Sequence, residues 1–179
     1  NGNESILDFG CGCGRVTRYW ADFDGSVAGS DVSRKAIDWC RENLGFASFL
    51  HNGLAPGLDA DDNEFDLVYA LSVFTHLTDE LQLAWRDELH RVLRPGGRLL
   101  ITTHGRSYLS RLDDDEREQF ERGRLVVRWA DIPGTNLCSA YHPERYLRET
   151  FAQGFTFVEL DPEGARGNPT QDLVLLQKN

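Results

Sequence analysis

The sequence has no apolar run of about 18 residues, the length that a membrane-spanning helix requires, so we expect no membrane span. It also lacks a basic segment followed by an apolar one at its start, the pattern of a secretory signal. Its four cysteines, Cys11, Cys13, Cys40 and Cys138, are too few and too scattered for a disulfide-stabilised fold. These absences favour a protein of the reducing cytoplasm.

Positive charge is also scarce, because 19 Lys and Arg residues against 29 Asp and Glu residues give a net charge of -10. Proteins that bind nucleic acid usually present a basic face, so we expect no nucleic-acid partner. Arg86, Arg91, Arg94 and Arg98 do cluster, but they surround an expected helix end, where cations offset the helix dipole. With 40% hydrophobic residues, the chain can bury the core of a single globular domain, residues 1–179.

Strand-like and helix-like segments alternate over the first two-thirds of the chain. The apolar patterns predict strands at 5–9, 26–30, 47–51, within 64–74 and at 98–103. Helices are predicted at 14–23, at 33–44 with Ser33 as its N-cap, and from Thr78 to the Arg-Pro-Gly-Gly turn at 94–97. On the third helix, Trp85 belongs to an apolar stripe with Leu81, Leu89, Val92 and Leu93. Such alternation indicates right-handed crossovers and a doubly wound, mostly parallel α/β sheet.

The pattern changes after His104. Residues 113–123 are acidic and helix-prone, and residues 124–136 resemble a strand and a loop, so we expect an insertion or cap at about 106–140. A further helix is predicted at 142–153, with Pro143 near its first turn. The last two strand-like segments, 155–160 and 171–177, are joined by a Gly- and Pro-containing loop whose length favours an antiparallel hairpin.

The segment "ILDFGCGCGRV", residues 6–16, allows two interpretations: a Cys-x-Cys metal site, or a glycine turn that a ligand approaches closely. In open parallel sheets, ligands bind at the carboxyl ends of the strands, where this turn lies. A dinucleotide fingerprint would place its third glycine at position 15, but that residue is Arg15. For a metal, Cys11 and Cys13 have no second pair, because Cys40 and Cys138 stand alone. We therefore expect no metal and disfavour a dinucleotide.

The segment Asp8-Phe9-Gly10-Cys11-Gly12-Cys13-Gly14 resembles the first motif of the class I (Rossmann-like) S-adenosylmethionine-dependent methyltransferases, an acidic residue followed by x-G-x-G-x-G. "GSDVS" places Asp31 after the second strand, and "FDLVYALSVFTHL" and "LRPGGRLLITTHG" resemble later motifs of the family. The terminal hairpin is similar to its antiparallel seventh strand. The resemblance implies a seven-stranded, mostly parallel sheet with an antiparallel terminal strand, and S-adenosylmethionine as the cofactor.

The resemblance also implies a set of cofactor contacts. Asp31 would bind the ribose, because a carboxylate accepts two hydrogen bonds from a vicinal diol, and Asp8 would approach the methionine end. Many members carry an acidic residue after the third strand; here Asn52 would have to serve through its side-chain carbonyl, or Gly53 and Leu54 through their backbone. The full set of expected cofactor-binding residues is Asp8, Gly10, Cys11, Gly12, Asp31, Val32, Asn52, Gly53, Leu54, Leu71, Ser72 and His76.

Methyl transfer is an in-line displacement, to which a protein contributes mostly positioning and desolvation. A base is needed only for a weakly acidic acceptor group, and His104 and Tyr141 are the candidate catalytic residues. A histidine in such a loop more often has a structural role. Tyr108, Trp129 and Tyr141 are candidates for an acceptor pocket, although Trp129 fits the core equally well.

We therefore expect a S-adenosylmethionine-dependent methyltransferase whose acceptor is a small molecule or a sugar- or lipid-linked intermediate. The alternatives are a catalytically inactive methyltransferase-like binding domain and, less favoured, a dinucleotide-dependent oxidoreductase. The family usually has helical segments before its first strand, whereas this chain begins almost at the strand. This departure is what a domain excised from a longer multidomain chain would show.

Overall fold

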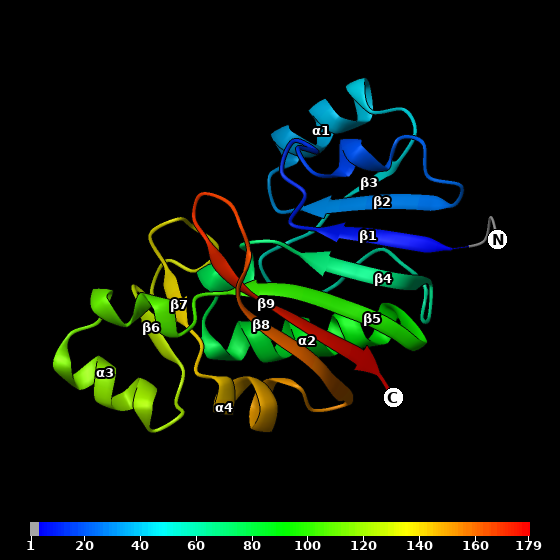
Figure 1. The fold of residues 1–179 in the computed structure, drawn as a ribbon. Coiled ribbons are helices and arrows are strands. Elements are labelled where there is room, and N and C mark those ends of the chain that lie inside the picture. The colour runs from blue at the N-terminus through cyan, green and yellow to red at the C-terminus, as the bar shows by residue number, and fades with distance from the viewer. Residues whose placement is uncertain (1–3) are drawn as a thin grey trace.

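Seven strands form one mixed sheet in the computed structural model, which describes residues 4–179 (Figure 1). The strand order is β3-β2-β1-β4-β5-β9-β8. Strands β1 to β5 are parallel, and β9 runs antiparallel to both β5 and β8. The strands are β1 (Ser5–Phe9), β2 (Ser26–Asp31), β3 (Ser48–His51), β4 (Phe65–Ala70), β5 (Leu93–Thr103), β8 (Phe155–Ala165) and β9 (Gln171–Lys178). The predicted doubly wound sheet with an antiparallel terminal strand is confirmed.

The central strand β1 sets the position of the glycine turn. All five of its residues are buried, as expected for a parallel strand that is covered on both faces. Its register pairs Asp8 with Gly29 and Phe9 with Ser30 on β2, so the two strands end together. The amide of Gly10 then donates to the Ser30 carbonyl at 2.8 Å. The turn after β1 and the end of β2 therefore meet at one edge of the sheet.

The crossover helices begin where their capping residues predict. Helix α1 (Arg34–Asn43) is capped by the Ser33 hydroxyl, which accepts from the Ala36 amide, and it packs against β2 and β3. Helix α2 (Asp79–Val92) is capped in the same way by Thr78 and packs against β5. The last helical segment comprises α4 (Glu144–Tyr146) and one π-helical turn, η4 (Leu147–Phe151). These three helices agree with the sequence analysis.

The helix predicted at 14–23 is wrong. Only a short 3-10 helix, η1 (Thr17–Trp20), forms there. Gly14 at the start of the predicted helix has a φ of +71°, outside the helical region, and Thr17 uses its hydroxyl to bind Asp8. A helix this short gains little by itself, so these tertiary contacts decide its conformation.

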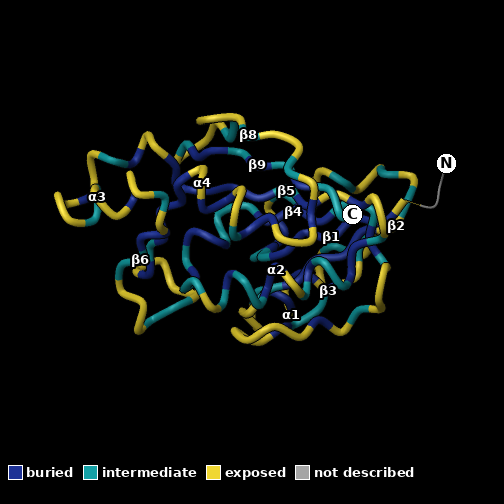
Figure 2. The backbone as a smooth tube through the Cα atoms, turned by 90° about the horizontal axis from the view of Figure 1, so that it is seen from below, coloured by how far each residue is buried: buried dark blue, intermediate teal, exposed yellow. Residues whose placement is uncertain are grey.

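The main core lies between the sheet and its helices, where the buried stretches of chain run through the strands (Figure 2). Trp85, Leu89 and Val92 on α2 are buried in it, together with Phe74 and Phe151, whose rings meet edge to face. Three of the four clustered arginines, Arg86, Arg91 and Arg94, pair with carboxylates, which offsets their charge. No helix among residues 4–179 has the length and apolar character to cross a membrane.

A second, smaller lobe lies beside the end of the sheet, at the left of Figure 1. It contains η3 (Arg106–Arg111), α3 (Asp114–Glu121) and an antiparallel pair of β6 (Val126–Arg128) with β7 (Ser139–Tyr141). Its own core comprises Tyr108, Leu112, Phe120, Val126 and Tyr141. The alternative that Trp129 is a core residue is wrong, because this side chain is 56% exposed. We call residues 106–141 the cap.

Candidate functional site

A cavity of about 340 Å³ opens at the carboxyl ends of β1, β2 and β4. Its walls come from the glycine turn, the start of α1, the short helix η2 (Phe74–His76), α2 and the cap. Eight of the twelve residues expected to bind a cofactor line it: Gly10, Asp31, Val32, Asn52, Leu54, Leu71, Ser72 and His76. Asp8, Cys11, Gly12 and Gly53 do not line it, and their contacts are described below.

The three glycines of the turn have different neighbours. A Cβ on Gly10, whose φ is +80°, would lie 2.3 Å from Cγ2 of Val73. A Cβ on Gly14 would lie 2.3 Å from Cδ1 of Leu44. A Cβ on Gly12, whose φ is +55°, would meet nothing within 4 Å. The outer two glycines therefore allow close packing, whereas Gly12 exposes its backbone to open space that a ligand can enter.

Asp31 joins the glycine turn to the start of α1. Its Oδ2 accepts from the Gly12 amide at 2.8 Å, and its Oδ1 accepts from the Ser33 amide at 2.7 Å. A carboxylate oxygen has two lone pairs, so each oxygen can still accept a further hydrogen bond. The side chain also lines the cavity. Asp31 can therefore order the turn and bind a pair of ligand hydroxyls at the same time.

Asn52 lines the same cavity and has a hydrogen-bond acceptor that the described residues do not use. Its side chain is 4% exposed, and its amide nitrogen donates to the Gly53 carbonyl at 2.9 Å. Its Oδ1 has no hydrogen-bond partner within residues 4–179. Leaving a buried acceptor unsatisfied costs about 1–3 kcal/mol. A ligand that places an N–H donor here would recover that energy, whereas Gly53 adds only its backbone to the turn.

Asp8 lies beneath the turn and away from the cavity. Its carboxylate is 3% exposed and accepts from the Thr17 hydroxyl at 2.6 Å, with a second hydrogen bond from Tyr69. Burial raises the pKa of Asp8, and the hydrogen bonds from Thr17 and Tyr69 lower it in part. In this conformation Asp8 anchors η1 to the end of β1. Its contact with the methionine end of a cofactor stays a prediction.

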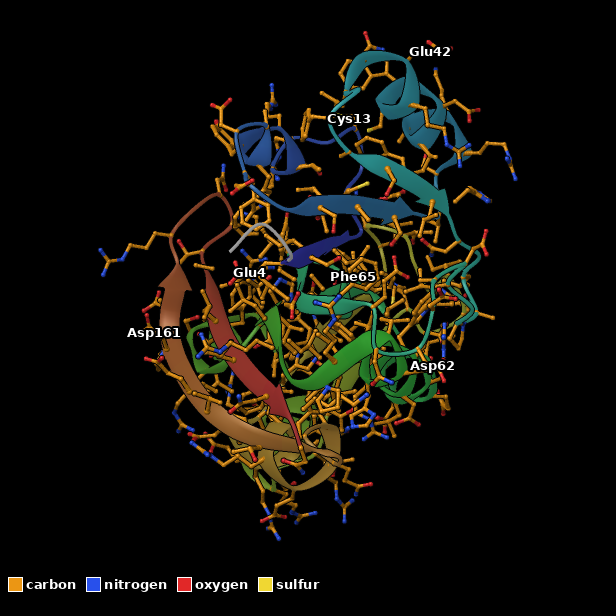
Figure 3. All side chains as sticks on the ribbon, turned by 90° about the vertical axis from the view of Figure 1, so that its right-hand side faces the viewer. Glu4, Cys13, Glu42, Asp62, Phe65 and Asp161 are labelled. Atoms are coloured by element: carbon orange, nitrogen blue, oxygen red, sulfur yellow. The ribbon has the colours of Figure 1, made fainter. Side chains whose placement is uncertain are left out.

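The two cysteines of the turn point in different directions. Cys11 is buried, whereas Cys13 lies on the exposed side of the loop (Figure 3). The thiols of Cys11 and Cys40 both donate to the Gly12 carbonyl at 3.5 Å. Burial raises the pKa of Cys11, so its thiol stays protonated and is a poor metal ligand. In the described chain, no three His, Cys, Asp or Glu side chains are placed to hold a metal ion.

The cap reaches the cavity through His76, a contact that the sequence analysis missed. The His76 ring Nδ1 lies 2.8 Å from the Cys138 carbonyl, and its own carbonyl accepts from the Gly134 amide at 2.7 Å. Gly134 and Asn136 consequently form part of the cavity wall. Because the carbonyl can only accept, Nδ1 carries a proton and donates it to this hydrogen bond. No local sequence signal marks a contact between residues so far apart in the chain.

A second cleft, of about 450 Å³, adjoins the first and shares Leu71 and Ser72 with it. Ser72 has a φ of +60°, a strained conformation for a residue with a side chain. Its amide donates to the Thr102 hydroxyl at 2.8 Å, and its hydroxyl donates to Oε1 of Gln171 at 2.8 Å. Thr102 and Gln171 are further residues that the sequence analysis did not select. Strain that is held in place where two cavities meet is typical of functional sites.

The candidate catalytic residues lie behind this network. His104 is 8% exposed, stacks on Tyr108 with a centroid distance of 4.2 Å, and its Nε2 lies 3.2 Å from the Gln171 amide nitrogen. Burial is the main cause that lowers the pKa of His104 to about 4, so the ring is neutral near pH 7. Tyr141 is buried in the core of the cap. Neither side chain lines the two cavities, and their catalytic role stays a prediction.

The comparisons with known proteins agree with this geometry. The family model described as "Methyltransferase domain" matches residues 7–101, more than half of the chain and the whole region that carries the glycine turn, Asp31 and Asn52. The chain belongs to this methyltransferase family. The match and the fold together identify a class I methyltransferase domain, for which S-adenosylmethionine is the cofactor.

The individual relatives align with this chain over different lengths. An uncharacterized methyltransferase of Synechocystis is 35% identical over 94 residues, which cover 52% of this chain and 44% of that protein. A malonyl-[acyl-carrier protein] O-methyltransferase of Enterobacter lignolyticus is 28% identical over 155 residues, covering 75% of this chain and 61% of that protein. The crystal structure of a SAM-dependent methyltransferase from Methanosarcina mazei has a TM-score of 0.71 at 21% identity, covering 99% and 93% of the two chains. The chain thus spans less than two-thirds of either curated relative.

The cavity of this methyltransferase domain fits the chemistry of S-adenosylmethionine. The ribose diol has the two donors that Asp31 can accept, and the adenine amino group has the donor that the buried Oδ1 of Asn52 lacks. The exposed apolar side chains of Val32 and Leu54 border the same space and can cover a flat base. The open side of Gly12 leaves the loop backbone accessible.

Two buried histidines make the stability of this domain sensitive to acid. Burial lowers the pKa of His104 to about 4 and that of His142 to about 3. The unfolded chain takes up these protons near pH 6.5, so the free energy of unfolding should fall as the pH drops from there towards 4. Each histidine contributes a slope of up to about 1.4 kcal/mol per pH unit. The raised pKa of Asp8 acts in the opposite direction.

Urea unfolding at about pH 7 and about pH 5 measures this slope. In His142→Gln, the new amide can still donate to Oε1 of Gln82, which lies 3.0 Å from the His142 ring, but the titrating group is gone. We expect a smaller loss of stability on acidification in this variant than in the wild type. His51→Gln, at a partly exposed site, is the control. An unchanged slope in His142→Gln would contradict the assignment.

Proposed function

We propose that this domain is an active methyltransferase that transfers a methyl group from S-adenosylmethionine to a small-molecule acceptor. The observation that carries the proposal is the cavity at the strand ends. A carboxylate with spare lone pairs, Asp31, and a buried amide side chain with an unsatisfied oxygen, Asn52, line this cavity, and the open backbone of Gly12 lies in the adjoining turn, hydrogen-bonded to that carboxylate. An inactive binding domain would have no need for the second cleft that adjoins this cavity at Ser72.

The proposal assigns a role in cofactor binding to Asp31, Asn52 and Gly12. The cofactor, when bound, supplies an electrophilic methyl group. Asp31 accepts from its ribose hydroxyls, Asn52 accepts from its adenine amino group, and Gly12 leaves room beside the turn. Methyl transfer needs mainly positioning and exclusion of water, and the cap loop around Gly134 covers one side of the cavity. The acceptor occupies the second cleft.

The other functions considered have less support. A dinucleotide-dependent oxidoreductase would need a glycine where Arg15 stands. A nucleic-acid acceptor would suit a basic face better than a net charge of -10. A small molecule is the acceptor class of the proposal. We also propose a reducing compartment such as the cytoplasm, which the four unpaired cysteines favour.

The test compares two glycines that both have positive φ. Isothermal titration should give saturable binding of S-adenosylmethionine to the wild type and none of NAD. In Gly12→Ala, the new methyl enters the open space beside the turn, and we expect binding at least about tenfold weaker, since one blocked contact can cost about 1.4 kcal/mol.

Gly96→Ala is the matched control. Gly96 has a φ of +78°, and a Cβ added there would meet no atom closer than 3.9 Å, but it lies at the far end of β5. Both variants should lose about 1 kcal/mol of stability from backbone strain. Only Gly12→Ala should lose affinity for the cofactor. If S-adenosylmethionine fails to bind the wild type, or if NAD binds instead, the proposed function is wrong.

A further inference from the structure

The second cleft differs in charge from the rest of the molecule. The chain has 29 Asp and Glu residues against 19 Lys and Arg, yet no Asp or Glu lines this cleft. Arg15 and Arg166 do line it. Arg15 directly follows the glycine turn, and Arg166 lies in the loop between β8 and β9. The cleft is therefore locally basic on an acidic protein.

Neither arginine is engaged by the protein itself. Within residues 4–179, the side chains of Arg15 and Arg166 make no hydrogen bond, ion pair or ring contact. Ten other arginines of the chain form ion pairs with carboxylates. Arg98 and Arg124 are also without a side-chain partner among the described residues, but Arg15 and Arg166 lie together at one cleft. Their charge is available to a ligand.

The hydrogen-bonded polar side chains of the cleft carry no charge. Oε1 of Gln171 accepts from the Ser72 hydroxyl at 2.8 Å and from the Thr102 hydroxyl at 2.6 Å. The amide nitrogen of the same side chain lies 3.2 Å from the His104 ring. These side chains are neutral near pH 7 and form hydrogen bonds with one another. Recognition of a charged group in this cleft therefore depends on the two arginines at its rim.

We propose that this cleft binds a small acceptor that carries an anionic oxygen group, a carboxylate or a phosphate, and that Arg15 and Arg166 bind that group. The planar guanidinium matches both anions, since its N–H donors form a fork that fits their oxygen pairs. Leu71 and Ser72 belong to both cavities, so an acceptor held at the rim reaches the cofactor cavity at these residues. This inference rests on the proposed function and adds the substrate class.

The test measures three probes by NMR titration in the presence of saturating S-adenosylhomocysteine. The probes are 4-hydroxybenzoate, phenyl phosphate and the neutral methyl 4-hydroxybenzoate, which separate the carboxylate, the phosphate and the uncharged ring. At least one anionic probe should bind about tenfold more tightly than the ester at low ionic strength, and salt should reduce the difference. The probe with the larger preference identifies the anion.

The double variant Arg15→Gln, Arg166→Gln should abolish this preference and leave binding of the ester unchanged. The control is Arg98→Gln, Arg124→Gln, which removes the same charge from two exposed arginines outside both cavities and should keep the preference. Equal binding of the ester and both anions, no binding of either anion, or the same loss in the control would overturn the proposal.

A different result would reassign Arg15. If the double variant weakens S-adenosylhomocysteine but keeps the preference for anions, Arg15 binds the carboxylate of the cofactor, and the proposal is wrong. The same titrations without S-adenosylhomocysteine separate this inference from the proposed function. A wild type that binds anions in the cleft but no S-adenosylhomocysteine would refute the function and leave the anion site standing.

Discussion

Replacing Asp31 with alanine should weaken the binding of S-adenosylmethionine by about 100-fold or more, because each hydrogen bond to a charged group is worth about 1.5–3 kcal/mol. The carboxylate has two parts in the site. It accepts from the amides of Gly12 and Ser33, and it faces the cavity with lone pairs to spare. The alanine variant loses the ribose contact and also the hydrogen bond that holds the glycine turn in place.

Titration calorimetry measures this effect, and two further variants separate its causes. Asp31→Asn keeps one acceptor oxygen without the charge, so we expect an affinity between those of the wild type and the alanine variant. Asp38→Ala is the control, because Asp38 is an exposed residue of α1 that pairs only with Arg41, at 3.5 Å. The cofactor assignment fails if Asp31→Ala binds as tightly as Asp38→Ala.

The parallel half of the fold could be predicted because its signals are local. The apolar run at 5–9 became β1 with the same bounds, and Ser33 and Thr78 cap α1 and α2 as their side chains predict. The helix predicted at 14–23 failed for a non-local reason. Its residues serve the glycine turn and Asp8, and a contact with a buried carboxylate outweighs a weak helical preference.

The candidate site, like the fold, could be predicted only where its sequence signals are local. Sequence motifs locate the ends of β1, β2 and β4, and the structure places residues such as Gly10, Asp31 and Ser72 at one cavity there, while their binding of a cofactor stays a prediction. The motifs do not predict which other residues form the remaining walls of the cavity. His76 contacts Cys138, 62 positions away, and Ser72 contacts Gln171, 99 positions away. Pairing of the cap and of β9 with the sheet creates these contacts, and neither pairing has a local signature.

Trp85 shows how one residue of a predicted apolar stripe can belong to the core and to the site. It is 1% exposed, and its ring centroid lies 4.6 Å from that of Phe9. It also lines the cofactor cavity, and its indole N–H donates to the Leu54 carbonyl at 2.8 Å. The stripe predicted the burial, but the hydrogen bond to the loop after β3 depends on the tertiary fold.

Trp85→Ala should therefore lower the free energy of unfolding by about 3–5 kcal/mol, as expected for truncating a large buried aromatic side chain. Such a loss is a large part of the stability of a typical domain, so urea unfolding will detect it readily. Trp39→Ala is the matched control, since Trp39 is 47% exposed on α1 and its loss should cost no more than about 0.5 kcal/mol. Equal losses in the two variants would contradict the packing described for α2.

Trp85→Phe separates the packing role of Trp85 from its hydrogen bond to the Leu54 carbonyl. The phenyl ring keeps most of the contact with Phe9, but the Leu54 carbonyl loses its donor, at a cost of about 1 kcal/mol. Leu54 borders the cofactor cavity beside Asn52, so a loosened loop should weaken S-adenosylmethionine binding even where the variant is fully folded. Calorimetry well below the unfolding midpoint measures this effect. Wild-type affinity in Trp85→Phe would show that Trp85 supports the site through packing alone.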